Sequence, residues 1–227
     1  TTLLPDGTVL ATGGTSSPGF NDATAPALAA EVWDPATEAW TTLAAMQVPR
    51  LYHSTALLLP DGRVLSAGGG LQPAAGDFNR QDAQIFSPPY LYQGPRPVIT
   101  SAPATVSNGE AFLVETPDAA GIGAVRWIRL SSVTHAFDQN QRVNRLPFSV
   151  TRAGLFATAP PDSNHCPPGH YLLFILSADG VPSLGRVVEV TRPPAGEPVP
   201  GSRGLALRGA RPNPALQPTA TTPRVSR

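Results

Sequence analysis

Residues 51–70, LYHSTALLLPDGRVLSAGGG, decide the fold of this chain. Two apolar segments, Ser54 to Leu59 and Arg63 to Ala67, are separated by a Pro-Asp-Gly sequence. Pro and Asp suit the early positions of a tight turn and Gly tolerates a positive φ, so the stretch predicts a β-hairpin. A Tyr-His pair precedes the first strand and a glycine triplet follows the second, where the backbone can turn or approach another segment closely.

The same pattern occurs earlier in the chain. Residues 2–14 read TLLPDGTVLATGG, which places Asp6 and Asp61 55 residues apart. A second echo pairs EVWDP at 31–35 with QIFSP at 84–88. A period near 50 residues, with short strands and Gly-Gly punctuation, is typical of kelch-type propeller blades.

These motifs resemble a known family. Tyr52-His53-Ser54, the LLPDGRV and GGGL segments, DAQIF at 82–86 and PYLY at 89–92 together resemble the last blades of the copper-radical oxidases, the family of galactose oxidase and glyoxal oxidase. The resemblance continues to about Thr191. It implies that residues 1–92 form about two blades of a partial kelch-type β-propeller.

A proline-rich connector, GPRP at 94–97, starts a new module. Between residues 96 and 191 short alternating segments predict about seven strands, an immunoglobulin-like sandwich of the early-set type that follows the propeller in this family. The expected strands are Val98 to Thr100, Ala111 to Glu115, Ala124 to Leu130, Pro147 to Thr151, Leu155 to Thr158, Gly169 to Leu176 and Arg186 to Val190. The fold class is therefore all-β. Residues 192–227, rich in Pro, Gly and Arg, predict a disordered tail or the start of a truncated sorting module.

Composition excludes several classes of function. The 16 basic residues are all Arg, so lysine Schiff-base chemistry and a Walker-type phosphate lysine are excluded within this chain. A formal net charge of zero gives no reason to expect nucleic acid as a partner, and no apolar run is long enough to span a membrane. The single cysteine cannot form an intrachain disulfide. Because two blades cannot close a propeller, we expect a C-terminal fragment whose partners include missing N-terminal blades.

Tyr52, His53 and His135 are the candidate metal ligands. His135 follows an apolar strand in a polar segment, and a lone loop histidine is more often solvated than a ligand. By resemblance, however, Thr134-His135 followed by Asp138 is the segment with which the family's last domain donates a histidine to copper. Two imidazoles and a phenolate oxygen suit Cu²⁺. Adjacent strand residues point to opposite faces, so Tyr52 and His53 share a metal only if the backbone there is irregular.

The resemblance also implies roles in catalysis. Tyr52 corresponds to the axial tyrosine that accepts the substrate's hydroxyl proton, and Phe20 corresponds to an aromatic at the substrate rim. The family's Tyr-Cys radical cofactor comes from earlier blades and has no match in this chain. HCPPGH at 165–170 is a rival metal motif, but it offers three ligands in a stiff turn, so we interpret it as a turn before a strand.

We therefore expect a fragment of a secreted copper-radical oxidase, which converts a primary alcohol, aldehyde or carbohydrate and O₂ to an oxidised product and H₂O₂. The fragment would supply copper ligands and would be inactive alone. The alternative is a non-catalytic kelch propeller with an immunoglobulin-like domain that binds glycan or protein. An upstream cysteine placed to cross-link a tyrosine would favour the oxidase.

Overall fold

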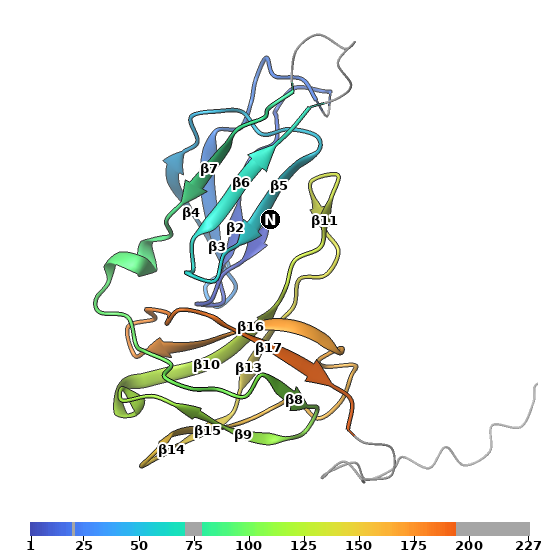
Figure 1. Cartoon of the computed structure of the whole chain (residues 1–227). Coiled ribbons are helices and arrows are strands. Elements are labelled where there is room, and N and C mark those ends of the chain that lie inside the picture. Colours follow the sequence, from blue (N-terminus) through green and yellow to red (C-terminus); the bar gives the residue numbers. More distant parts are fainter. Residues whose placement is uncertain (20, 71–78, 194–227) are drawn as a thin grey trace, which may run out of the picture.

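The structure is a computed structural model, and it describes residues 1–19, 21–70 and 79–193. It confirms the predicted all-β fold (Figure 1). A first antiparallel sheet contains β1 (Thr2–Leu3), β2 (Val9–Ala11), β3 (Ala29–Asp34) and β4 (Ala39–Ala45), in that order. A second contains β5 (Ser54–Leu58), β6 (Val64–Gly68) and β7 (Ala83–Phe86). A short 3₁₀ helix, η1 (Pro89–Tyr92), follows the second sheet.

The two Pro-Asp-Gly turns have the same hydrogen bonds. The amide of Gly7 donates to Leu4 O at 2.9 Å, and the amide of Gly62 donates to Leu59 O at 2.9 Å. Both glycines have a positive φ, +92° and +82°, a region that costs a side-chain-bearing residue about 1–2 kcal/mol. The repeat seen in the sequence is therefore a repeat of local structure as well.

Between residues 105 and 191 the chain forms a β-sandwich. One layer has the order β13 (Val143–Leu146), β10 (Ile122–Arg129), β16 (Gly169–Ser177), β17 (Arg186–Thr191) and β8 (Thr105–Ser107). The other has the order β14 (Phe148–Thr151), β15 (Gly154–Thr158) and β9 (Ala111–Glu115). Trp127 stacks on Phe112 between the layers, with ring centroids 5.9 Å apart, and both are buried in the sandwich core.

Strand β16 is buried on both faces, which explains its continuous apolar run. Leu173 and Ile175 point into the sandwich core, whereas Leu172, Phe174 and Leu176 join a second core. That second core also contains Leu4, Leu10, Leu58 and Val64 from the first two sheets. The outer face of the sandwich is thus packed against the ends of both sheets by apolar contact.

Arginines of the sandwich module bind the two Pro-Asp-Gly turns. Arg126 Nη1 donates to Pro5 O at 3.0 Å, and Arg96 Nη1 donates to Asp61 O at 2.7 Å. Arg96 also donates to the carbonyls of Pro182 and Ser183. Burial lowers the pKa of both arginines, in keeping with guanidinium groups enclosed at an interface. The repeated turns therefore fix the sandwich relative to the sheets.

Several sequence expectations are corrected. Val98 to Thr100 is not a strand, because the Val98 amide donates to the Asp118 side chain at 2.8 Å and the segment meets β9 through an isolated bridge of Ser101 with Glu115. Strands β8 and β13 were not predicted, since both are short and partly polar. The number of kelch blades stays a prediction. The predicted tail, 192–227, lies outside the described residues from 194 onward. No helix among the described residues is long and apolar enough to cross a membrane.

Candidate metal centre

Tyr52 and His53 lie in a turn, not in a regular strand. The amide of Ser54 donates to Leu51 O at 3.0 Å, and His53 has a φ of +64°. Histidine is among the residues that tolerate this left-handed region better than most. The irregular backbone removes the alternation of a strand, so the Tyr52 and His53 rings lie side by side with centroids 3.9 Å apart. This is the irregularity that a shared metal would require.

The glycine triplet holds this turn. The amide of Gly70 donates to Tyr52 O at 2.7 Å, and the Nδ1 atom of His53 lies 3.0 Å from Gly70 O. A carbonyl oxygen only accepts, so Nδ1 of His53 carries the proton in this contact. Gly68, Gly69 and Gly70 all have positive φ, which lets the backbone pass close to the turn.

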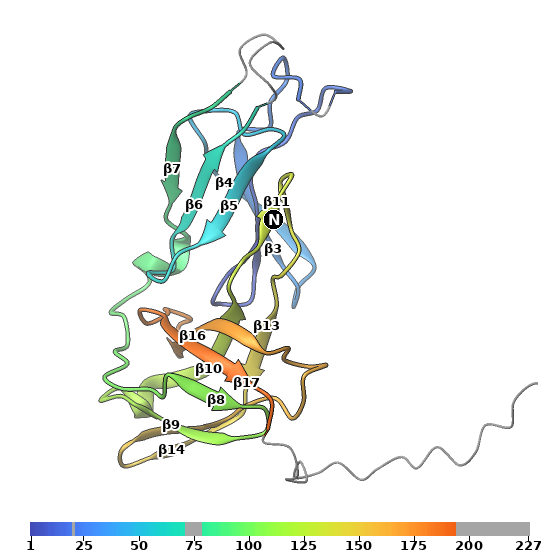
Figure 2. The ribbon, with the colours of Figure 1, turned by 45° about the vertical axis from the view of Figure 1, so that its right-hand side comes forward.

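His135 lies at the tip of a hairpin that projects from the sandwich. The hairpin pairs β11 (Val133–Thr134) with β12 (Phe137–Asp138), and its two tip residues, His135 and Ala136, have φ of +55° and +62°. Positive φ at both central positions is typical of a type I′ turn. Figures 1 and 2 show the hairpin rising from the sandwich beside the sheet of β5. At its base the amide of Leu3 donates to Gln141 Oε1 at 2.8 Å.

The structure brings the three predicted residues together. The ring centroids of His53 and His135 are 4.8 Å apart, and those of Tyr52 and His135 are 5.4 Å apart. Thr134 Oγ1 and His135 Nδ1 lie within hydrogen-bond distance at 2.7 Å. Both imidazoles therefore have Nδ1 engaged by protein oxygens, and within the described residues neither Nε2 makes a hydrogen bond.

The donor set fits Cu²⁺. Imidazole nitrogens with a phenol oxygen belong to the nitrogen and oxygen ligands that Cu²⁺ prefers. The Gly70 carbonyl on Nδ1 of His53 fixes that ring and its tautomer, which is the usual support of a metal-binding histidine, and Thr134 Oγ1 holds Nδ1 of His135. Within the described residues no group of three or more His, Cys, Asp and Glu side chains could hold a metal ion. A site here would therefore depend on tyrosine as well as on the two histidines.

A cleft of about 410 Å³ adjoins these rings. Its lining includes Tyr52 and His135, together with Gly13 and Gly14 of the first sheet. Both imidazoles are exposed and Tyr52 is half-buried. The two sheets and the hairpin thus border a space from which a small molecule could reach the Tyr52 phenol and the His135 imidazole.

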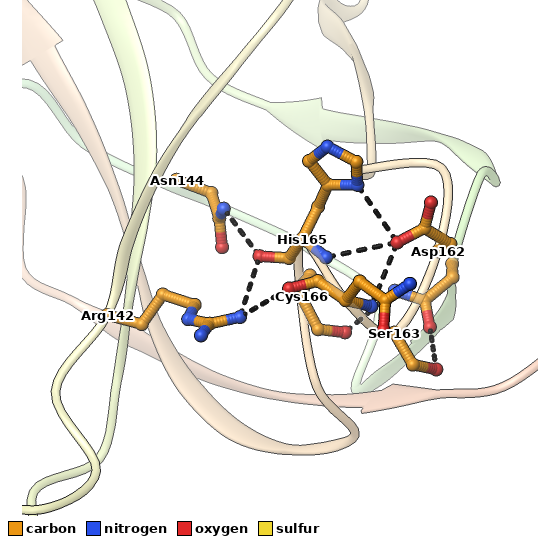
Figure 3. Close-up of polar contacts among 8 residues, drawn as sticks. Arg142, Asn144, Asp162, Ser163, His165 and Cys166 are labelled. Carbon is orange, nitrogen blue, oxygen red and sulfur yellow. Dashed lines mark hydrogen bonds and ion pairs between the residues drawn. The ribbon is translucent and has the colours of Figure 1, made fainter. Parts of the chain in front are cut away.

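The rival motif at 165–170 is a structural turn (Figure 3). Asp162 Oδ1 accepts hydrogen bonds from the amide of His165 at 3.0 Å and from its Nδ1 at 2.9 Å. Arg142 and Asn144 donate to His165 O. Cys166 is fully buried, and burial raises the pKa of its thiol. A protonated, buried thiol is a poor metal ligand, so the expectation of a turn before β16 agrees with the structure.

The described residues do not test every expectation from the sequence. Phe20, predicted at the substrate rim, lies outside the described residues, as do residues 71–78. The sequence did not predict that oxygens of Gly70 and Thr134 contact the two imidazoles. Their positions beside Tyr52-His53 and His135 were visible in the sequence, but the contacts depend on the turn and the hairpin tip.

Two family descriptions match almost the whole described chain. Residues 1–90 match "Glyoxal oxidase N-terminus", and residues 96–190 match "Galactose oxidase-like, Early set domain". The boundary between the two matches falls at the Gly-Pro-Arg-Pro connector.

Curated relatives and a solved structure agree with these matches. Galactose oxidase of Gibberella zeae is 36% identical over 202 residues, which are 84% of this chain and 28% of that protein. Aldehyde oxidase GLOX of Vitis pseudoreticulata is 36% identical over 209 residues, 83% of this chain and 40% of that protein. A fungal alcohol oxidase of the AA5 family, solved in complex with copper, matches with a TM-score of 0.79 and 35% identity over 84% of this chain and 41% of its own. The chain thus spans well under half the length of these relatives.

Proposed function

Because this chain belongs to the galactose oxidase-like family, we propose that it forms the copper-binding part of a copper-radical oxidase. The observation that carries the proposal is the convergence of three rings from segments 82 residues apart in the sequence. His53 and His135 would bind the metal through Nε2, and Tyr52 through its phenol oxygen. The complex of the related alcohol oxidase with copper supports this choice of metal.

The reaction would be the oxidation of a primary alcohol or an aldehyde by O₂. For an alcohol, two electrons and two protons pass from the CH–OH group to O₂, which gives an aldehyde and H₂O₂. Bound copper supplies Lewis acidity that lowers the pKa of an alcohol. The chain's own contribution is general-base catalysis, in which the Tyr52 oxygen accepts the hydroxyl proton from a substrate in the adjoining cleft. Phe20 would contribute to the substrate rim.

The radical centre would come from outside this chain. The single cysteine, Cys166, is buried in the sandwich core beside Tyr171 and Trp127, whereas Tyr52 lies in the turn before β5. This chain matches only 28% and 40% of two of these relatives, which leaves ample sequence for a Tyr-Cys pair and further blades in a full-length protein. We propose that the full-length protein contains them and is secreted, as the family resemblance implies.

The test is copper titration of the full-length protein beside an assay for H₂O₂ release. We expect near-stoichiometric Cu²⁺ and peroxide from at least one compound in a panel of primary alcohols, aldehydes and sugars. Peroxide release should cease when copper is chelated and return when copper is restored. If the full-length protein has a Tyr-Cys pair, holds copper and still releases no peroxide, a non-catalytic glycan- or protein-binding role becomes the better account.

A further inference from the structure

Arg50, two residues before Tyr52, has unused hydrogen-bond donors in a buried position. Its side chain is 1% exposed, and Nη1 donates to Gly68 O at 3.0 Å and to Asp82 Oδ1 at 3.1 Å. Within the described residues Nε and Nη2 make no hydrogen bond. Buried N–H groups without partners are costly, so something is expected to accept from them.

Asp138, on the hairpin that carries His135, has an unused acceptor. Its Oδ1 accepts from the amides of Ser132 at 3.2 Å and Asn140 at 3.0 Å, which closes the base of the hairpin. Its Oδ2 is buried and has no hydrogen-bond partner among the described residues. The hairpin thus presents a lone carboxylate oxygen toward the sheets.

Arg50 and Asp138 line the same polar cavity. It has a volume of about 30 Å³, and its lining also includes Ser54, Thr55 and Thr12. Within the described residues the two charged groups form no ion pair, so a gap separates them. A polar cavity needs roughly 10–15 Å³ for each water, so this one has room for about two. The donors lie on the Arg50 side and the acceptor on the Asp138 side, which is the arrangement that a bridging water requires.

We propose that this cavity is a binding site for ordered water that bridges Arg50 to Asp138 and so positions the His135 hairpin against the turn of Tyr52 and His53. The Cu²⁺ measurements that test this inference rest on the proposed copper-binding function. Arg50 is well placed for this role, because its own carbonyl accepts from the amide of Gly14 at 2.8 Å. One residue therefore links the first sheet, the second sheet and the hairpin. Arg50 and Asp138 would be positioning residues and would not touch copper.

The first experiment is a crystal structure of the full-length protein at a resolution that shows ordered solvent. We expect one or two waters within about 3.2 Å of Arg50 Nε or Nη2 and of Asp138 Oδ2. A dry cavity, a direct contact between the two side chains or a bound anion would each overturn the proposal. This result does not depend on copper, so it decides the proposal even if the proposed oxidase function fails.

The second experiment is a double-mutant cycle read by Cu²⁺ affinity and by the electron paramagnetic resonance of the bound Cu²⁺. Asp138→Asn keeps an oxygen for the amides of Ser132 and Asn140 but then turns an NH₂ group toward the cavity. Arg50→Lys keeps a cation for Gly68 O and Asp82 but loses the fork of the guanidinium. Each should weaken Cu²⁺ binding about tenfold, as loss of an outer support of a ligand does, and should reduce the fraction of signal with two nitrogen ligands.

The double variant should be no more than about twofold weaker than either single variant, because both changes break the same bridge. Gln139→Ala, an exposed neighbour on the hairpin, and Asp82→Asn, which removes the charge of Asp82 but keeps an oxygen for Arg50 Nη1, are the matched controls and should leave the two-nitrogen signal unchanged. If the double variant binds Cu²⁺ about a hundredfold more weakly than the wild type, the two changes act independently, and the proposal is overturned. Thermal unfolding of each copper-free variant separates a loss of stability from a displacement of the His135 hairpin.

Discussion

Two regions of this molecule set imidazoles beside other potential metal ligands, and they use them differently. At 165–170 the ligand types are adjacent in sequence, yet His165 bonds to Asp162 within its own turn and Cys166 is buried. His53 and His135 are 82 residues apart, yet their ring centroids lie 4.8 Å apart. A cluster of potential ligands in the sequence therefore does not by itself predict a metal site. What matters is whether separate elements direct free nitrogens at one point.

The largest expected effect separates the two regions directly. His53→Ala or His135→Ala in the full-length protein should weaken Cu²⁺ binding by about a hundredfold or more, since losing even an outer support costs 10–100-fold. His165→Ala is the matched control and should leave the affinity unchanged. Isothermal titration against a competing chelator measures both. Equal losses of Cu²⁺ affinity in His53→Ala and His165→Ala would contradict the proposed difference between the two regions.

Tyr52 sharpens the comparison, because it should act on turnover more than on binding. Tyr52→Phe keeps the ring beside both imidazoles but removes the oxygen, so turnover should fall by about a hundredfold, the usual scale for a lost general base. Copper occupancy should fall only slightly, because two imidazoles supply most of the selectivity. Peroxide release and copper content are measured on the same sample. Full activity in the variant would refute the assigned role.

The fold was largely readable from the sequence, whereas the site was not. The Pro-Asp-Gly hairpins depend on turn residues that act locally, and the apolar run of β16 marks a strand buried on both faces. Spacing alone gave no reason to join His53 to His135. Their proximity depends on the docking of the sandwich through Arg96 and Arg126 and on the shared core. The resemblance to a family supplied the pairing of His53 with His135, which local sequence patterns do not encode.

The hairpin tip gives a smaller effect. Ala136 lies in the left-handed region, which favours glycine, so Ala136→Gly should stabilise the protein by about 0.5–1 kcal/mol. Ala136→Val should have the opposite sign, because a β-branched residue tolerates this region poorly. Urea unfolding of both variants measures the change. A destabilised glycine variant would contradict the hairpin conformation that presents His135.

The smallest effect lies in the rival region. The backbone amide of His165, and then its side chain, lower the pKa of Asp162. A carboxyl with a lowered folded pKa contributes stability above its unfolded value near 3.9, and this contribution is lost as the pH falls through the folded pKa. Asp162→Asn should therefore be less stable than the wild type at pH 6, and the difference should shrink below about pH 4. A difference independent of pH would contradict this, and copper affinity should not change.

The most direct test of the central claim is the position of the metal. A crystal of the full-length protein soaked in Cu²⁺ should show an anomalous peak at the copper edge about 2 Å from the Nε2 atoms of both His53 and His135. The Tyr52 oxygen should face the same peak, and no comparable peak should lie beside His165 or His170. A peak on one imidazole alone, or at the 165–170 turn instead, would contradict the account.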